Sequence, residues 1–267
     1  MFKLKSKLII AVMVMFGITA FMSCEKKEIV ENSNTVSNIE SDFKQFLIDS
    51  EKKASEETNK TFSISYSKNI YDYEGAKHNE ILDYLNKEGV LFNSNISIIM
   101  SKMTTSYGLE FKCKPDEFER RTNTIISNVY NRDNSYNSAY INSFNINNYE
   151  KAILNCYFNT MSRIQNTTVR IILSKYAENY IINSNLSKIE KKRILTAFAV
   201  YRYSTYYWNN INLNKSINDV SIPDLIDAIC TYMAQNVEGE YEYMFQDGKD
   251  INMYASTMSA TASSLMW

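Results

Sequence analysis

The sequence predicts an all-α domain of about seven or eight helices over residues 42–267. Apolar side chains recur at steps of three and four residues along almost all of this range, which is the period of one helix face. Only 6 Gly and 2 Pro occur in the chain, which argues against a collagen-like, Pro-rich or linker-dominated chain. Alternation at period two, which is typical of a strand, is confined to Thr61–Tyr66 and predicts one short strand there.

Four segments in the first half of this domain have helical apolar spacing: residues 39–47, 80–87, 96–103 and 115–130. Phe43 and Leu47 lie on one face of the first helix. The second ends before Gly89, because glycine readily takes the left-handed conformation that closes a helix. The fourth begins at Pro115, whose fixed φ suits a first turn, and two acids that favour the positive end of the helix dipole come directly after it.

The second half contains the expected helices 149–164, 168–182 and 187–208, one that opens at Asp219 or Ser221 and ends at Gly239, and a terminal helix within 255–267. Ser187 and Glu190 have the spacing of a capping box, in which each side chain bonds the amide of the other residue. The most regular apolar face of the chain comes after this box: Ile194, Phe198, Tyr201, Thr205 and Trp208. We expect that face to be buried.

The first 24 residues differ in composition from the rest. Three lysines precede an apolar run, Leu8–Met22, that is shorter than the ~20 residues a membrane-spanning helix needs. A basic start, an apolar run and a small residue before the cut are typical of a secretory signal. The tetrad Phe21-Met22-Ser23-Cys24 resembles the lipobox of bacterial lipoproteins, although Phe21 replaces the usual Leu and Met22 is larger than the preferred residue.

This resemblance implies that residues 1–23 are removed and that Cys24 becomes the lipidated first residue, with fatty acids such as palmitate anchoring it to a membrane. The alternative is an ordinary signal peptide that is cleaved nearby. We expect the protein in the cell envelope, at the outer membrane, on its periplasmic or its outer surface. Residues 24–41 are rich in Asn, Ser and Glu and predict a flexible tether.

The charge balance argues against a nucleic-acid partner. Without residues 1–23, the chain keeps 26 basic and 30 acidic residues, whereas nucleic-acid binding normally requires a basic excess or a basic stripe. The densest basic cluster, Lys188 with Lys191, Lys192 and Arg193, opens a helix and contains Glu190. We interpret it as a solvated helix face.

Catalysis finds little support in the residues. The only histidine, His78, stands among Lys77, Asn79 and Glu80, which predicts an exposed position at the start of a helix. No Gly-x-Ser-x-Gly elbow accompanies it. We therefore predict no catalytic residue, while an enzyme that works with carboxylates alone stays open as an alternative.

Metal and cofactor sites are not expected either. Cys113, Cys156 and Cys230 are not at metal-ligand spacing, and the apolar neighbours of the last two predict buried, unreactive thiols. The acidic tracts Glu238–Glu242 and Asp247–Asp250 lack the pattern of a calcium-binding loop and predict a solvated connection.

Tyr203, Tyr206 and Tyr207 are the candidate binding surface, because they fall partly off the apolar face of their helix. Exposed aromatics bind sugars and proteins, but the same pattern also suits a wide buried face. The function we expect is that of a lipid-anchored envelope protein with a non-enzymatic binding or structural role and an unknown protein or glycan partner. The alternatives are a glycan-binding or glycan-processing accessory lipoprotein, and a self-protection protein that neutralises a toxin at the envelope.

Overall fold

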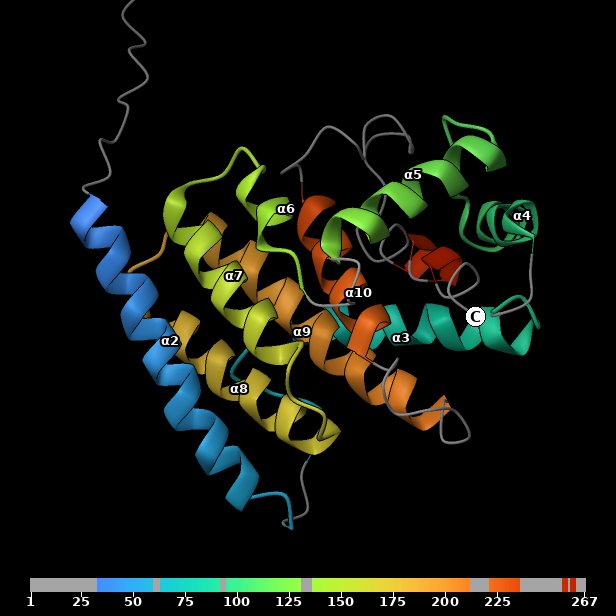
Figure 1. Ribbon diagram of the computed structural model, residues 1–267. Coiled ribbons are helices and arrows are strands. Elements are labelled where there is room, and N and C mark those ends of the chain that lie inside the picture. The colour runs from blue at the N-terminus through green and yellow to red at the C-terminus, as the bar shows by residue number, and fades with distance from the viewer. Residues whose placement is uncertain are drawn as a thin grey trace, which may run out of the picture. The chain divides into compact units, whose positions relative to one another are not determined.

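The computed structural model describes residues 33–59, 63–91, 95–130, 136–211, 221–235, 256–258 and 260–262. Contacts divide the chain into two units, Met1–Thr35 and Val36–Trp267, and the fold below is that of the second. Its helices are α2 (Ser33–Glu56), α3 (Asp72–Lys87), α4 (Ile96–Tyr107), α5 (Pro115–Val129), α6 (Ser138–Asn142), α7 (Asn148–Met161), α8 (Thr167–Asn183), α9 (Lys188–Ile211) and α10 (Ser221–Met233). The prediction of an all-α fold is confirmed (Figure 1). The short helix α6 was not among the predicted segments.

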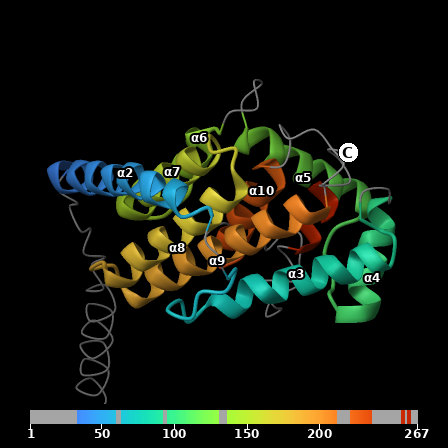
Figure 2. The ribbon, with the colours of Figure 1, turned by 90° about the horizontal axis from the view of Figure 1, so that it is seen from below.

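Helix α9 is the centre of the fold. It packs against α3, α8 and α10, and both views show it between these helices (Figures 1 and 2). The predicted apolar face of α9 is completely buried, as expected: Ile194, Phe198, Tyr201, Thr205 and Trp208. Further residues of α9 are buried outside that face, among them Arg202, Ser204 and Tyr207. They are buried because neighbouring helices cover α9 on several sides.

Asparagine begins several helices. Asn95, Asn137, Asn147 and Asn166 precede α4, α6, α7 and α8, and each side chain accepts a hydrogen bond from a backbone N–H of the first turn. These bonds satisfy N–H groups that have no partner within the helix. The frequent asparagines of this chain therefore serve partly as helix caps.

Most predicted helix boundaries agree with the structure. Helix α5 begins at Pro115, and Gly89 lies just beyond α3 with a φ of 70°. The capping box is present: the Ser187 amide donates to the Glu190 carboxylate over 2.6 Å, and the Glu190 amide donates to the Ser187 hydroxyl over 3.3 Å. Residues 256–258 and 260–262 are helical and buried, in agreement with the expected terminal helix.

Three local predictions need correction. The segment 63–66, the described part of the predicted strand, is not a strand, and its backbone is held by side chains instead, since the Ile64 carbonyl accepts from Arg202. Helix α10 ends at Met233, before Gly239, which lies outside the described residues. Helix α2 begins at Ser33, so the predicted tether 24–41 is helical from that residue onwards. Residues 24–32 lie outside the described residues.

The early start of α2 results from its packing. Phe43, Leu47 and Ala54 are fully buried. The rings of Phe43 and Phe46 both contact the Tyr180 ring of α8, with centroids 4.9 and 4.7 Å apart. Once one turn of a helix is held by packing, adding residues to it is easy, because nucleation is the costly step.

Candidate functional site

His78 is buried, and its predicted exposure at a helix start is wrong. The helix begins at Asp72, so His78 lies in the second turn of α3 with no exposed surface. Its Nε2 atom is 3.7 Å from Oδ2 of Asp227 on α10. Burial lowers the pKa of His78 to about 4, because a charged imidazole would lose its hydration there.

Asp227 brings a serine, a histidine and an indole together. The Ser204 hydroxyl and Trp208 Nε1, both on α9, donate to the same Asp227 oxygen, the latter over 3.1 Å. In a catalytic triad the serine bonds the histidine, which in turn bonds the carboxylate. Here the serine bonds the carboxylate directly, and His78, Ser204 and Asp227 are all fully buried. We interpret the group as a polar layer that joins α3, α9 and α10 inside the core.

A second buried group surrounds Arg202 of α9. Its guanidinium pairs with Glu178 of α8 over 2.8 Å and with Asp72 of α3, and Asn69 also donates to Glu178 over 2.8 Å. Burial raises the pKa of Glu178, and Arg202 opposes that rise. Burial also acts to raise the pKa of Asp72, but Arg202 and Ser65 outweigh it, and the net shift is downward.

A third group lies between α8, α9 and α10. Arg170 pairs with Asp224 over 2.7 Å, and the Thr205 hydroxyl donates to the same carboxylate oxygen over 3.0 Å. Burial raises the pKa of Asp224 to about 7, against the opposing charge of Arg170. Neither Arg170 nor Asp224 was predicted to be a core residue. Buried charges of this kind are normally paired, and these satisfy that rule inside the helix bundle.

The three tyrosines of the predicted binding surface do not form one. Tyr207 is buried, and its ring packs edge-on against Trp208. Tyr203 is half-buried, and its hydroxyl donates to Asp72 over 3.1 Å. Only Tyr206 is exposed, at 44%. The three tyrosines therefore do not lie on one exposed surface, and Tyr207 fits the alternative of a wide buried face, because α3 and α10 pack against α9.

The predictions for the described cysteines agree with the structure. Cys156 and Cys230 are buried and form no disulfide, and Cys113 is half-buried. Burial raises the pKa of Cys156 to about 11, so its thiol stays protonated and unreactive near neutral pH. Cys24 and the acidic tracts Glu238–Glu242 and Asp247–Asp250 lie outside the described residues.

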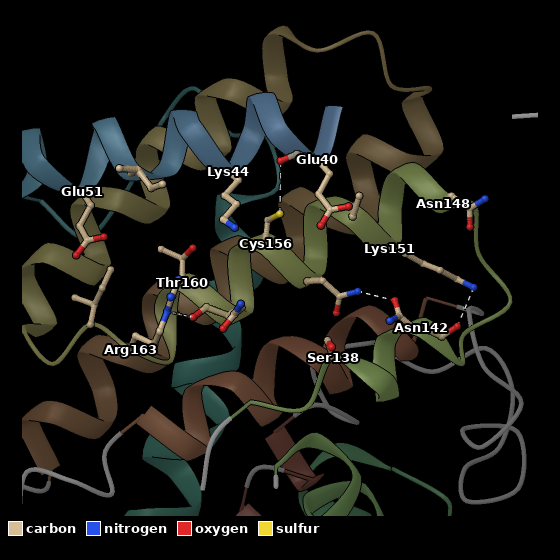
Figure 3. Close-up of a pocket in the computed structure, with 15 residues that line it drawn as sticks. Glu40, Lys44, Glu51, Ser138, Asn142, Asn148, Lys151, Cys156, Thr160 and Arg163 are labelled. Atoms are coloured by element: carbon tan, nitrogen blue, oxygen red, sulfur yellow. Dashed lines mark hydrogen bonds between the residues drawn. The ribbon is translucent and has the colours of Figure 1, made fainter. Parts of the chain in front are cut away.

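Solvent-accessible polar side chains converge in a groove between α2, α6 and α7, with a volume of about 700 Å³ (Figure 3). This volume lies in the range of small-ligand sites, roughly 300–1,000 Å³. The groove is lined by Glu40, Lys44, Ile48, Glu51, Ser138, Asn142, Asn148, Lys151, Ala152, Asn155, Cys156, Asn159, Thr160, Arg163 and Ile164. It is called the α2–α7 groove below.

Helix α2 supplies one wall with a stripe of four side chains. Glu40, Lys44, Ile48 and Glu51 succeed one another at steps of four, four and three residues, beside the buried stripe of Phe43 and its neighbours. The three charged groups extend from α2 towards α7 (Figure 3). Within the described part of the chain, none of these three makes an ion pair or a side-chain hydrogen bond, in contrast to the Arg170–Asp224 and Arg202–Glu178 pairs of the core.

The opposite wall is held in place by hydrogen bonds. Asn155 Nδ2 donates to Asn142 Oδ1 over 2.7 Å, and Tyr136 donates to Asn155 Oδ1 over 2.8 Å. The Lys151 ammonium donates to the Asn142 carbonyl over 2.9 Å, and Arg163 Nε donates to the Asn159 carbonyl over 2.9 Å. These bonds fix the wall before any ligand arrives.

Sequence reasoning missed this groove. One local feature of the sequence could have indicated it. Asn148, Asn155 and Asn159 share a face of α7, and because asparagine is unfavourable in helices, its repetition on one face indicates a polar surface with another role. That α2 would lie opposite this face could not be deduced from periodicity.

Comparison with protein-family models, with curated proteins and with solved structures found no match for this chain. Among the described helices, none has both the length and the apolar character that crossing a bilayer requires. No group of three or more His, Cys, Asp or Glu side chains in the described residues is placed to hold a metal ion.

Proposed function

We propose that this protein is a lipid-anchored cell-envelope protein that binds a ligand in the α2–α7 groove without chemically changing it. The observation that carries the proposal is the contrast between two sets of charges. Arg170 and Arg202 of the core form ion pairs with Asp224 and Glu178 inside the bundle. Glu40, Lys44 and Glu51, by contrast, face an open groove and make no ion pair in the described residues. Such side chains can bond a ligand without first breaking an internal contact.

Binding without catalysis fits the groups that line the groove. Its thiol, Cys156, has a raised pKa, and His78 lies in the core, outside it. The two lining carboxylates, Glu40 and Glu51, are eleven residues apart on one helix, which corresponds to about 16 Å along its axis. A pair that cleaves glycosidic bonds needs its carboxylates within roughly 5–9.5 Å. The described groove residues therefore give no support to the glycan-processing alternative.

The anchor is supported by the lipobox-like tetrad that ends in Cys24. One acyl chain holds a protein at a membrane only marginally, and two or more hold it stably. Helix α2 begins nine residues after Cys24. In the sequence, an anchor on Cys24 therefore precedes the helix that supplies one wall of the groove.

Photo-cross-linking in cells tests the groove. The photoreactive residue p-benzoylphenylalanine replaces Ile48 in the groove or, as a matched control, Ile98 on α4. Both isoleucines are exposed to a similar degree, 51% and 45%. We expect a product of discrete mass from position 48 in the membrane fraction and none from position 98. The same products from both positions, or none from position 48, would contradict a binding groove.

A further inference from the structure

The charges of the α2 stripe alternate along the groove. Glu40, Lys44 and Glu51 give the order acidic, basic, acidic, with the 51% exposed Ile48 between the last two. At 1.5 Å per residue, steps of four and three residues correspond to about 6 and 4.5 Å along the helix axis. The stripe from Glu40 to Glu51 is therefore about 16 Å long.

An extended peptide has a matching repeat. Its residues rise about 3.3 Å each, so side chains on one face are about 6.6 Å apart. Four such side chains span about 20 Å. The difference of about 4 Å over the whole stripe can be taken up by long, flexible side chains such as lysine. A peptide with basic, acidic, apolar and basic side chains at alternate positions would complement the stripe.

The opposite wall suits the backbone of such a peptide. A side-chain amide offers both N–H donors and a carbonyl acceptor, as a peptide group does. In the described residues, the side-chain amide of Asn159 and the side-chain Nδ2 of Asn142 have no hydrogen-bond partner. Both side chains line the groove. Arg163 uses only its Nε in a hydrogen bond with described residues, so its terminal nitrogens can reach a carbonyl or a carboxylate.

No aromatic ring lines the groove among its described residues. The described walls therefore offer no stacking surface, and the charge order acidic, basic, acidic is more typical of a peptide than of a sugar chain. We infer that the α2–α7 groove binds an extended peptide segment with the pattern basic-x-acidic-x-apolar-x-basic. This inference rests on the proposed function and names the class of its ligand.

The test uses two heptapeptides with blocked ends, Lys-Ser-Glu-Ser-Leu-Ser-Lys and its charge-swapped partner Glu-Ser-Lys-Ser-Leu-Ser-Glu. Binding to the full chain in detergent is measured by NMR or fluorescence at low salt, because surface charges are screened at high salt. We expect the first peptide to bind at least about tenfold more tightly, which equals ~1.4 kcal/mol. The triple variant Glu40→Lys, Lys44→Glu, Glu51→Lys should reverse the preference.

Asp49→Lys is the matched control, because it makes the same change in net charge on α2 but lies outside the groove. It should keep the wild-type preference. Glu40, Lys44 and Asp49 are exposed and Glu51 is half-buried, so the variants should fold, and circular dichroism checks that they do. Equal binding of both peptides, or a preference that the triple variant leaves unchanged, would overturn the inference.

A hexamer of galacturonic acid serves as the competing probe. If it binds, if Lys44→Gln abolishes its binding, and if neither peptide binds, the peptide class is wrong while the proposed binding function stands. If no probe binds but position 48 cross-links in cells, the peptide inference falls alone. If no probe binds and position 48 gives no product, both proposals fall.

Discussion

The Nε2 atom of His78 lies 3.7 Å from Oδ2 of Asp227, and both side chains are fully buried. The distance is longer than a hydrogen bond, and Ser204 and Trp208 donate to the same oxygen. The histidine is therefore a neutral core residue on α3 that lies next to a hydrogen-bonded carboxylate on α10. This relationship connects two segments about 150 residues apart in the chain.

The protonation of His78 can be measured directly, because it is the only histidine. We expect the folded protein to show an imidazole pKa near 4, against about 6.5 for an unfolded chain. Since the unfolded state takes up the proton first, stability should fall as the pH drops from about 6.5 to about 4. NMR titration of the imidazole checks the pKa. A value near 6.5 would show that the ring reaches solvent.

The contribution of His78 to the pH dependence of stability must be separated from that of Asp224. Asp224 has a raised pKa of about 7, so its contribution runs the other way and lowers stability as the pH rises between about 4 and 7. Comparing wild type with His78→Gln isolates the histidine. We expect the wild type to lose more stability than the variant between pH 6.5 and 4, in urea unfolding at each pH. A constant difference over this range would contradict a buried neutral histidine.

Phe198→Ala should destabilise the fold strongly. Phe198 is fully buried on α9, and its ring stacks on Tyr157 with centroids 3.6 Å apart. Removing a buried ring of this size costs about 3–5 kcal/mol. Tyr206→Ala on the same helix is the control and should cost under about 1 kcal/mol, because Tyr206 is exposed. Urea unfolding measures both. Similar losses from the two variants would mean that α9 is oriented differently.

Gly75→Ala tests how closely α3 and α9 approach. A Cβ at Gly75 would lie 2.4 Å from Cδ2 of Tyr203 and 2.7 Å from the Ala199 carbonyl oxygen. The backbone atom cannot move aside cheaply, so we expect a loss of about 1–3 kcal/mol in urea unfolding, although alanine favours helices. Glu80→Ala, an exposed position on α3, is the control. A gain in stability for Gly75→Ala would show that the two helices are further apart.

The lipid anchor predicts a simple labelling result. A fatty acid supplied to growing cells should mark the wild-type protein and not Cys24→Ser, because the Cys24 sulfur would carry the acyl chains. Cys113→Ser should keep the label. The unlabelled variant should stay unprocessed or be released from the membrane fraction. Equal labelling of Cys24→Ser would rule out this site.

Local patterns determined much of the fold. The apolar face from Ile194 to Trp208, the start of α5 at Pro115 and the Ser187–Glu190 capping box were all predictable, because each depends on residues within one or a few helical turns. The same local logic placed Cys156 and Cys230 in the interior. These local features are compatible with many different packing arrangements of the helices, so they do not define the tertiary structure.

Only the tertiary structure decided which other faces were covered. His78 and Tyr207 look exposed by local pattern, but both are buried. Helices α3 and α10 both pack against α9, and His78 lies beside Asp227 of α10. The α2–α7 groove joins Lys44 to Asn159 across more than a hundred residues. Periodicity identifies the most apolar face of a helix, but how many faces are buried depends on its neighbours. Which helices become neighbours depends on contacts between residues far apart in the sequence, and local periodicity does not contain that information.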